Sequence, residues 1–220
     1  MKSICVAAKR EWNAVLSYYS IKIENCQKYP LGEYFIHDSI LFFRCGVRKT
    51  NSSAATQYII DHFNLDNLIC IGTCAGIDLN YSINDIFIPN QAVQWDCTLS
   101  NESLFKETFI IPIDISNLNF QFKTGTIATG DKAIVTYKDW SLLNSQHTTI
   151  ADCECGAIAY VCKMNHVPFL AIKGITYFPE INLSPKESDK KQTQQFINHT
   201  PNIIHTILNE YVPKILITKQ

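Results

Sequence analysis

The sequence lacks an excess of charge of either sign, with 19 lysines and arginines against 20 aspartates and glutamates and a formal net charge of -1. A dedicated nucleic-acid-binding protein shows a basic stripe, so this balance argues against a nucleic-acid partner. Apolar runs of membrane-spanning length are also missing. The N-terminal run, Ile4–Ala8, ends at Lys9 and is shorter than the apolar core of a signal peptide. We therefore expect a cytoplasmic protein with no membrane partner.

Spacings typical of metal and cofactor sites are missing as well. The nine cysteines include no C-x-x-C pair and the six histidines no H-x-x-x-H pair, so we expect no metal site. Gly72 and Gly76 lie in a G-x-x-x-G spacing, which is not the G-x-G-x-x-G of dinucleotide-binding proteins, and we expect no cofactor. Without an export signal, cysteines in apolar runs, such as Cys70 and Cys162, are predicted to be buried, reduced thiols.

The sequence does contain enough apolar residues for one sizeable core. Hydrophobic residues make up 46% of the chain and charged residues 18%. No repeat, linker or low-complexity segment divides it, so residues 1–220 are predicted to form a single domain. Expected strands and helices alternate along the chain, which predicts an α/β fold with helices on both faces of a central sheet.

Hydrophobic periodicity and turn residues indicate the expected elements. The expected strands are Met1–Ala8, Glu33–Asp38, Ser39–Cys45, Leu68–Ile71, Ile86–Ile88, Gln91–Trp95, Phe120–Thr129 and Val167–Ile175. The expected helices are Lys9–Tyr19, Asn51–Phe63, Tyr137–Leu143, Gly156–Met164 and Gln194–Tyr211. Asn51 or Ser52 is predicted to cap the second helix, and Pro201 to kink the last helix or delay its start. We expect Thr98–Leu118 to be a loop with a short helix and Asn182–Gln195 to be a mobile loop.

The stretch Ile150–Glu180 is predicted to form the wall of a ligand site. It opens with an acidic cluster at a helix start and ends as a buried strand with polar residues at its carboxyl end, and such ends frame clefts in α/β proteins. Glu154 is a charge in an otherwise apolar segment, which packing does not explain. Glu11 lies at a strand-to-helix junction and is compatible with a site residue or with a solvated first-turn glutamate. The small residues Gly72–Gly76 are compatible with close approach of a ligand or with a tight turn.

Four segments of the chain carry these features in order. They read ICVAAKREWNAV, IGTCAGIDLNYSINDIFI, TGTIATGDKAI and ADCECGAIAYVCKMNHVPFLAIKGIT. They resemble four segments of the nucleoside phosphorylase and nucleosidase superfamily, in particular of the methylthioadenosine/S-adenosylhomocysteine nucleosidases. The first resembles that family's N-terminal strand with its catalytic glutamate. The other three resemble, in order, its TGSAGGL…VGDIVV, GLIVSGD and VEMEGAAIAQVC…VPFVVVRAIS segments. The resemblance covers Ile4 to about Tyr211 and implies a three-layer α/β/α fold around a mixed, twisted sheet.

The resemblance also implies roles for individual residues. Glu11 would hold or activate an attacking water, and Glu154 would bind the ribose hydroxyls beside Cys153. Thr73 lies where relatives hold the nucleophile or the phosphate. The other predicted substrate contacts are Ala75, Gly76, Asp131, Ala133 and Ile134, with Asp131 flanking the base and Ile134 near its face. The family also implies a homodimer whose partner chain closes the 5′ end of the pocket.

Departures from the family concern the half of the site that holds the base. Tyr177, a predicted catalytic residue, occupies the position of the aspartate that protonates or hydrogen-bonds the leaving adenine. Ala133 occupies the position of the aromatic residue that stacks on the base, and the family's arginine is Lys173. A phenol, with an ordinary pKa of about 10, is a weaker acid than a carboxylic acid, so Tyr177 is predicted to slow adenine release.

The residue types fit cleavage of an N-glycosidic bond. Breaking that bond builds positive charge on the ribose, which nearby carboxylates stabilise, and a carboxylate can also take a proton from water. Phosphorolysis needs an anion site, and Cys70 stands where related phosphorylases carry an arginine; Arg44 and Arg48 remain as possible sources of positive charge. We therefore expect a purine-type nucleoside hydrolase rather than a phosphorylase. A futalosine hydrolase-like enzyme and a nucleoside-binding protein with impaired catalysis are the alternatives.

Overall fold

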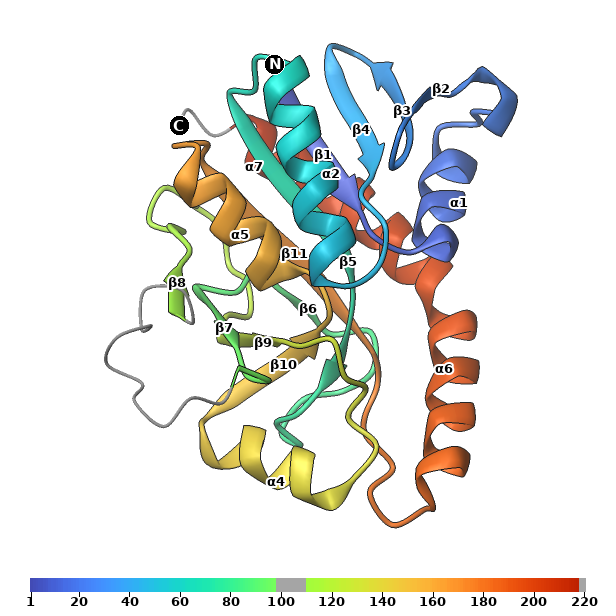
Figure 1. Ribbon diagram of the computed structural model, residues 1–220, viewed down its shortest axis with the longest axis vertical. Coiled ribbons are helices and arrows are strands. Elements are labelled where there is room, and N and C mark those ends of the chain that lie inside the picture. The colour runs from blue at the N-terminus through green and yellow to red at the C-terminus, as the bar shows by residue number, and fades with distance from the viewer. Residues whose placement is uncertain (98–109, 218–220) are drawn as a thin grey trace.

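The computed structural model describes residues 1–97 and 110–217. Within these residues eleven strands form one sheet in the order β2-β3-β4-β1-β5-β10-β9-β7-β8, and β11 pairs with both β5 and β6. Parallel and antiparallel pairs both occur, because β5 is parallel to β1 and β11 but antiparallel to β10. The mixed sheet that the family resemblance implies is therefore confirmed (Figure 1).

The elements have the following bounds. The strands are β1 (Lys2–Val6), β2 (Gln27–Tyr29), β3 (Gly32–His37), β4 (Ile40–Arg44), β5 (Asn67–Gly76), β6 (Ile86–Phe87), β7 (Gln91–Gln94), β8 (Ile110–Pro112), β9 (Thr126–Thr129), β10 (Thr148–Asp152) and β11 (Phe169–Tyr177). The helices are α1 (Lys9–Tyr18), η1 (Ile23–Asn25), α2 (Lys49–His62), α4 (Tyr137–Ser145), α5 (Cys155–Met164), α6 (Pro185–Thr206), the π-helical turn η3 (Ile207–Tyr211) and α7 (Val212–Ile217).

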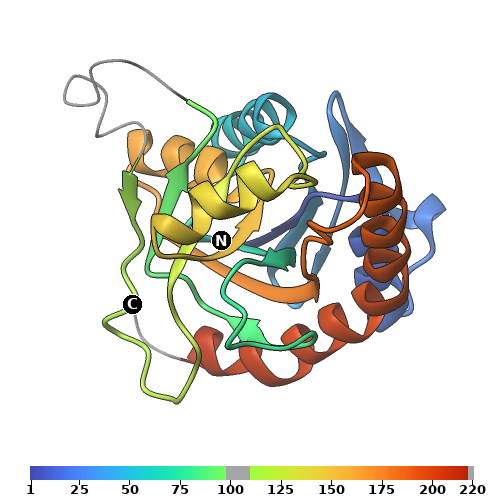
Figure 2. The same cartoon turned by 90° about the horizontal axis from the view of Figure 1, so that it is seen from below.

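Helices cover both faces of the sheet, which confirms the predicted three-layer α/β/α arrangement. Figures 1 and 2 show α2 and α5 together on one side, while α1 packs against α6 on the other. The apolar face predicted for α1 is buried, with Trp12, Val15 and Leu16 turned into the core. The strands β1, β5 and β11 between these layers are almost fully buried, as expected for a sheet that is covered on both faces.

The polar run that we expected to be a loop is instead the first half of α6. Ser184 caps the helix in a reciprocal arrangement with Glu187, and Pro185 occupies the first helical position, where its missing N–H costs nothing. Pro201 lies inside α6 and cannot bond the carbonyl of Ile197 four residues earlier. Arg10 of α1 donates its Nη2 to that carbonyl at 2.8 Å, so the two helices are joined where the proline leaves an acceptor free.

Other expectations about local structure need correction. The strand predicted to end at Ile71 continues to Gly76 while paired with β11, which excludes the tight turn that was one of two alternatives for Gly72–Gly76. The strand β10 was not predicted, and of the expected strand Phe120–Thr129 only β9 forms. The helix α2 begins at Lys49 rather than at an asparagine or serine cap, and Arg48 precedes it with a positive φ of 74°. Most of the expected loop Thr98–Leu118 lies outside the described residues.

Within the described residues, no helix is both long enough and apolar enough to cross a membrane. All nine cysteines are free thiols, and six of them, Cys5, Cys45, Cys70, Cys74, Cys155 and Cys162, are buried. Burial raises the pKa of the Cys5, Cys74 and Cys155 thiols, which keeps them protonated and unreactive.

A thiol titration checks the state of the cysteines. Protein denatured without reductant is expected to react at close to nine thiols per chain, because no pair is bonded in the native protein. A count of five or fewer would show two disulfides and contradict the prediction of a reduced protein. The matched control is the same sample reduced before denaturation.

Candidate nucleoside site

A cavity of about 340 Å³ opens at the carboxyl ends of β1, β5, β10 and β11. This is the edge of an α/β sheet where ligands usually bind. Seven of the predicted site residues line it, namely Glu11, Thr73, Ala75, Ala133, Cys153, Glu154 and Tyr177. Its walls therefore combine segments from the first and last thirds of the chain. The other lining residues are Ala7, Ala8, Val47, Arg48, Cys74, Ala151, Asp152, Thr176, Asp189, Gln192, Thr193 and Phe196.

Glu11 is only 4% exposed, although it lies in the first turn of a helix. Its Oε2 accepts the backbone N–H groups of Ala7 and Ala8, at 3.2 and 2.9 Å, which orients the carboxylate back over the end of β1. Its Oε1 accepts the backbone N–H of Thr73 at 2.7 Å and the Thr73 hydroxyl at 2.8 Å. Four donors to two oxygens match an ionised carboxylate, which only accepts hydrogen bonds. The reading as a solvated first-turn glutamate is therefore excluded.

Glu154 precedes α5 and faces the same cavity, with 8% of its surface exposed. Its Oε1 accepts the backbone N–H of Arg48 at 2.8 Å. The left-handed backbone of Arg48 is strained for a residue with a side chain, and it aims this N–H at the carboxylate. Burial, and then repulsion from Asp152, raise the pKa of Glu154 to about 8. Glu154 is therefore largely protonated near neutral pH in the empty site, so its carboxyl can both donate and accept hydrogen bonds.

A buried ion pair lies behind the two glutamates. Lys173 Nζ is 3.0 Å from Asp152 Oδ2, and both side chains are 2% exposed. Burial would lower the pKa of Lys173, but neighbours that include Cys70 and Asp152 raise it well above its usual value, so the ammonium stays charged. A Cβ at Gly72 would lie 3.3 Å from this ammonium and 2.8 Å from Glu11 Oε1. The side chains of Lys173 and Glu11 therefore both lie against the backbone of Gly72. Sequence reasoning noted Lys173 only as a replacement for an arginine.

Asp152 also organises the start of α5. Its carboxylate accepts the hydroxyl of Thr129 at 2.7 Å and the backbone N–H of Cys155 at 3.0 Å. The Thr129 hydroxyl oxygen in turn accepts the N–H of Gly156 at 2.8 Å. These bonds fix the turn between β10 and α5 on which Glu154 lies.

Tyr177 reaches the cavity through an irregularity in β11. The register with β5 shifts between Ile175 and Tyr177, so Thr176 is an extra residue and Tyr177 pairs with Ala75. Such a bulge changes the direction of the side chain that follows it. Burial, followed by the nearby Cys153, raises the pKa of the Tyr177 phenol, which therefore stays protonated and can donate a hydrogen bond.

Three residues predicted to contact substrate do not line the cavity. A Cβ at Gly76 would lie 2.3 Å from the Phe178 ring, so the glycine makes room for packing. Asp131 accepts the backbone N–H of Lys49 at 2.8 Å and holds a turn to the start of α2. Ile134 is buried in a second, smaller apolar cluster. In the described structure these three residues therefore serve packing or hold a turn.

Sequence reasoning missed the wall that α6 contributes, because this segment was predicted to be a loop. Asp189, Gln192, Thr193 and Phe196 line the cavity at positions i, i+3, i+4 and i+7 of the helix, which is one helical face. The capping box at Ser184 and Glu187 was the available signal for a helix here.

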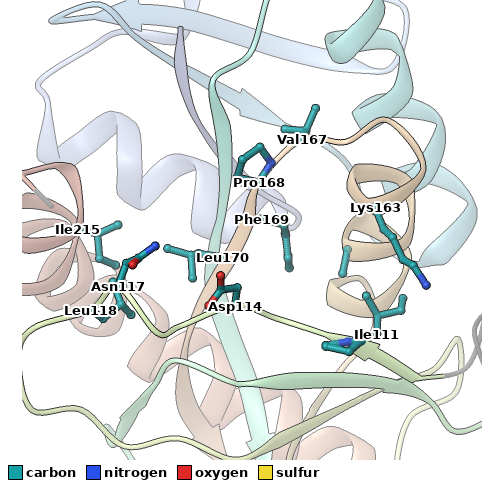
Figure 3. Close-up of a pocket in the computed structure, with 12 residues that line it drawn as sticks. Ile111, Asp114, Asn117, Leu118, Lys163, Val167, Pro168, Phe169, Leu170 and Ile215 are labelled. Atoms are coloured by element: carbon teal, nitrogen blue, oxygen red, sulfur yellow. The ribbon is translucent and has the colours of Figure 1, made fainter. Parts of the chain in front are cut away.

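A second cavity, of about 420 Å³, lies at the opposite end of β11, beside its first residue Phe169 (Figure 3). Its walls are mostly apolar, with Asp114 and Lys163 as the charged residues. None of the predicted site residues lines it. The smaller cavity is therefore the candidate site, because it gathers the carboxylates.

The sequence model of the phosphorylase superfamily matches residues 26–209 of this chain. The chain belongs to this superfamily. Among curated proteins, it is 26% identical over 199 residues to a 5′-methylthioadenosine/S-adenosylhomocysteine nucleosidase of Buchnera aphidicola, with 83% of this chain and 82% of that protein covered. The nucleosidase of that name from Thermotoga maritima is 31% identical over 135 residues, which cover 59% of this chain and 61% of the relative.

Solved structures of superfamily members share the fold. The methylthioadenosine/S-adenosylhomocysteine nucleosidase of Helicobacter pylori has a TM-score of 0.80 at 17% identity, covering 97% of this chain and 99% of that one. Futalosine hydrolase of the same organism has a TM-score of 0.76 at 18% identity, covering 94% and 97%. At such identities the likeness concerns the fold, so it does not decide between the two activities.

Proposed function

We propose that this protein hydrolyses the N-glycosidic bond of a purine-type nucleoside, in the manner of a methylthioadenosine/S-adenosylhomocysteine nucleosidase. The observation that carries the proposal is the convergence of Glu11 and Glu154, 143 positions apart in sequence, on one cavity at the carboxyl ends of the strands. Glu11 accepts four hydrogen bonds whereas the pKa of Glu154 is raised by burial, and two buried carboxyl groups in such different surroundings are suited to separate tasks in one reaction. The curated nucleosidases that align over most of the chain support the same reaction.

The site suggests how the work is divided. The Glu154 carboxyl exchanges hydrogen bonds with the ribose hydroxyls, which positions the sugar in the cavity. The attacking water binds the Thr73 hydroxyl, which can turn away from Glu11 Oε1; that oxygen keeps the Thr73 N–H and gains one open position at which it can accept a proton. As the C1′–N bond lengthens, the negative charge of Glu11 stabilises the positive charge that develops on the ribose ring.

Water is the proposed nucleophile. Cys70 is fully buried and its side chain cannot carry a positive charge, so the position where the compared phosphorylases carry arginine has no cation. Arg48 is the cationic residue among the described residues that line the cavity, so it is the side chain that could bind a phosphate. If phosphate were the second substrate, turnover would rise with phosphate concentration and Arg48→Gly would remove that dependence. A glycine also suits the left-handed backbone at this position.

Base release is the test of this proposal. Native protein in phosphate-free buffer is incubated with methylthioadenosine, S-adenosylhomocysteine, adenosine and inosine, and free base and sugar are quantified by chromatography. The expected products are the free base and the free sugar in equal amounts. Sugar 1-phosphate formed only in added phosphate would identify a phosphorylase. Binding without release from any of the four would favour the nucleoside-binding alternative.

Gly72→Ala is expected to lower turnover by about 10²-fold, because the new Cβ would lie 2.8 Å from Glu11 Oε1 and displace the carboxylate from Thr73. The measurement is kcat for base release, with the unfolding midpoint followed in parallel. A variant that folds and keeps full kcat would show that the position of Glu11 is not critical.

The proposed setting is a cytoplasmic homodimer acting on a small-molecule nucleoside, with no nucleic acid or membrane involved. Nine free cysteines are typical of a reducing compartment. The dimer follows from the family resemblance, and sedimentation at micromolar concentration is expected to give about twice the 25.0 kDa chain mass.

A further inference from the structure

Four carboxyl side chains line the cavity, and three of them are tied to the protein. Glu11 accepts hydrogen bonds from backbone and hydroxyl donors, Asp152 is ion-paired to a buried lysine, and Glu154 accepts a backbone N–H. The fourth, Asp189, has no hydrogen bond or ion pair with any residue that the structure describes. A carboxylate on a cavity wall with all its acceptor positions open is available to a ligand.

Asp189 is exposed to solvent and lines the cavity from α6, at the end that holds Tyr177. Ser188 and Gln192 on the neighbouring turn are buried, and the Gln192 amide is fixed by the Ser188 hydroxyl and the carbonyl of Ile134, at 2.9 and 3.0 Å. The charge of Asp189 acts on Tyr177, adding to the burial that raises the pKa of the phenol. The main charges that act on Glu154 are those of Asp152, Lys173 and Glu11, whereas both Asp189 and Glu154 act on Tyr177, so the phenol lies within reach of both carboxyl groups.

Other carboxylates near this end are not available. Glu180 is ion-paired to Lys191 and does not line the cavity. Asp131 accepts the N–H of Lys49 and is likewise outside the lining. A departing purine needs a partner here, because the electron pair of the broken bond goes to the base and a ring nitrogen must gain a proton.

We propose that Asp189 is the residue that recognises the leaving base, by accepting hydrogen bonds from its N–H groups, beside the Tyr177 hydroxyl. The inference rests on the proposed hydrolase function. In the reaction the C1′–N bond breaks, the base gains one proton from solvent at the open mouth, and Asp189 accepts the hydrogen bond of the new N–H. Water forms the C1′–O bond and passes one proton through Glu11 back to solvent. One nucleoside and one water thus give one sugar and one neutral base.

The test compares leaving groups. Asp189→Asn keeps the size of the side chain and removes its charge, and it is expected to lower kcat/KM for methylthioadenosine by roughly 10- to 100-fold, the size of a hydrogen bond to a charged group. Hydrolysis of 4-nitrophenyl β-D-ribofuranoside is expected to change less than twofold, because nitrophenolate leaves without gaining a proton. The matched control is Asp61→Asn, an exposed aspartate on α2 outside the cavity lining, which is expected to change neither rate.

The outcomes separate the two proposals. If native protein releases no base from any nucleoside, the hydrolase proposal fails, and the Asp189 inference is then decided by adenine binding alone. Calorimetry with free adenine is expected to give at least tenfold weaker binding to Asp189→Asn than to native protein. Native hydrolysis with unchanged kcat/KM in the variant, equal losses on both substrates, or unchanged adenine binding would each overturn the inference while leaving the hydrolase proposal standing.

Discussion

Glu154→Gln is expected to lower base release by at least about 10²–10³-fold while the protein remains folded. The amide has the same size, and its oxygen can still accept the N–H of Arg48, so the turn before α5 keeps its bond. The variant loses the carboxyl hydroxyl and the proton exchange by which Glu154 holds the ribose, and removal of one such contact in an active site typically costs that factor. Turnover by purified variant and native protein is compared under identical conditions. Glu210→Gln, on the exposed side of η3, is the matched control and should retain native turnover.

The same variant reports on the electrostatics of the site through its stability. The pKa of Glu154 is about 8 in the folded protein against 4.5 ordinarily, mainly because of burial. The folded state therefore binds the proton more tightly than the unfolded chain, and native stability from this group is lost as the pH rises from about 4.5 to 8. A glutamine does not titrate, so Glu154→Gln should gain stability relative to native protein across this window, by up to a few kcal/mol. Urea unfolding at pH 5 and pH 8 measures the difference; an equal difference at both values would contradict the raised pKa.

Lys173→Met is expected to cause the largest loss of stability of any single change considered, about 3–5 kcal/mol in the free energy of unfolding. The methionine fits the volume of the lysine stem but leaves the Asp152 carboxylate without its ion partner, in a place where only 2% of the side chain is exposed. An uncompensated buried charge is costly, whereas the intact pair adds little by itself. Denaturant unfolding of the two proteins at pH 7 provides the measurement.

A double variant separates the missing charge from lost packing. Asp152→Asn combined with Lys173→Met removes both charges, and it is expected to recover more than half of the stability lost in Lys173→Met. An asparagine oxygen at the place of Oδ1 can still accept both the Thr129 hydroxyl and the Cys155 N–H, so the start of α5 is preserved. A double variant as unstable as the single one would mean that Lys173 acts through packing, against the role inferred from the ion pair.

The fold class and the carboxylate half of the site could be predicted from the sequence. Buried strands are marked by apolar runs, and the motif around Glu154 stands out because a charge interrupts an apolar segment. Glu11 was ambiguous from its local sequence, since a first-turn glutamate is usually solvated. Its role as a buried ligand of Thr73 depends on β1 lying beside β5, a contact between distant segments that local sequence does not specify.

The α6 wall could not be predicted for a similar reason. The segment after Pro179 is polar. The residues of this segment that face the protein line a cavity and do not pack into the apolar core, so most of them are not hydrophobic. Helix capping at Ser184 gave a local signal, but hydrophobic periodicity was weak and Pro201 suggested a break. The Arg10 bond to the Ile197 carbonyl, which offsets that proline, comes from another helix. The role proposed for Asp189 therefore depends on the position of α6 against the cavity, which the local sequence does not specify.

A crystal structure with a non-hydrolysable adenosine analogue tests the account most directly. The analogue is predicted to lie in the 340 Å³ cavity with its ribose hydroxyls within hydrogen-bond distance of Glu154, its C1′ facing Glu11 and Thr73, and its base between Tyr177 and α6. Binding in the cavity beside Phe169 instead, or in the candidate site with the base against Glu154, would contradict the assignment of the site (Figure 3).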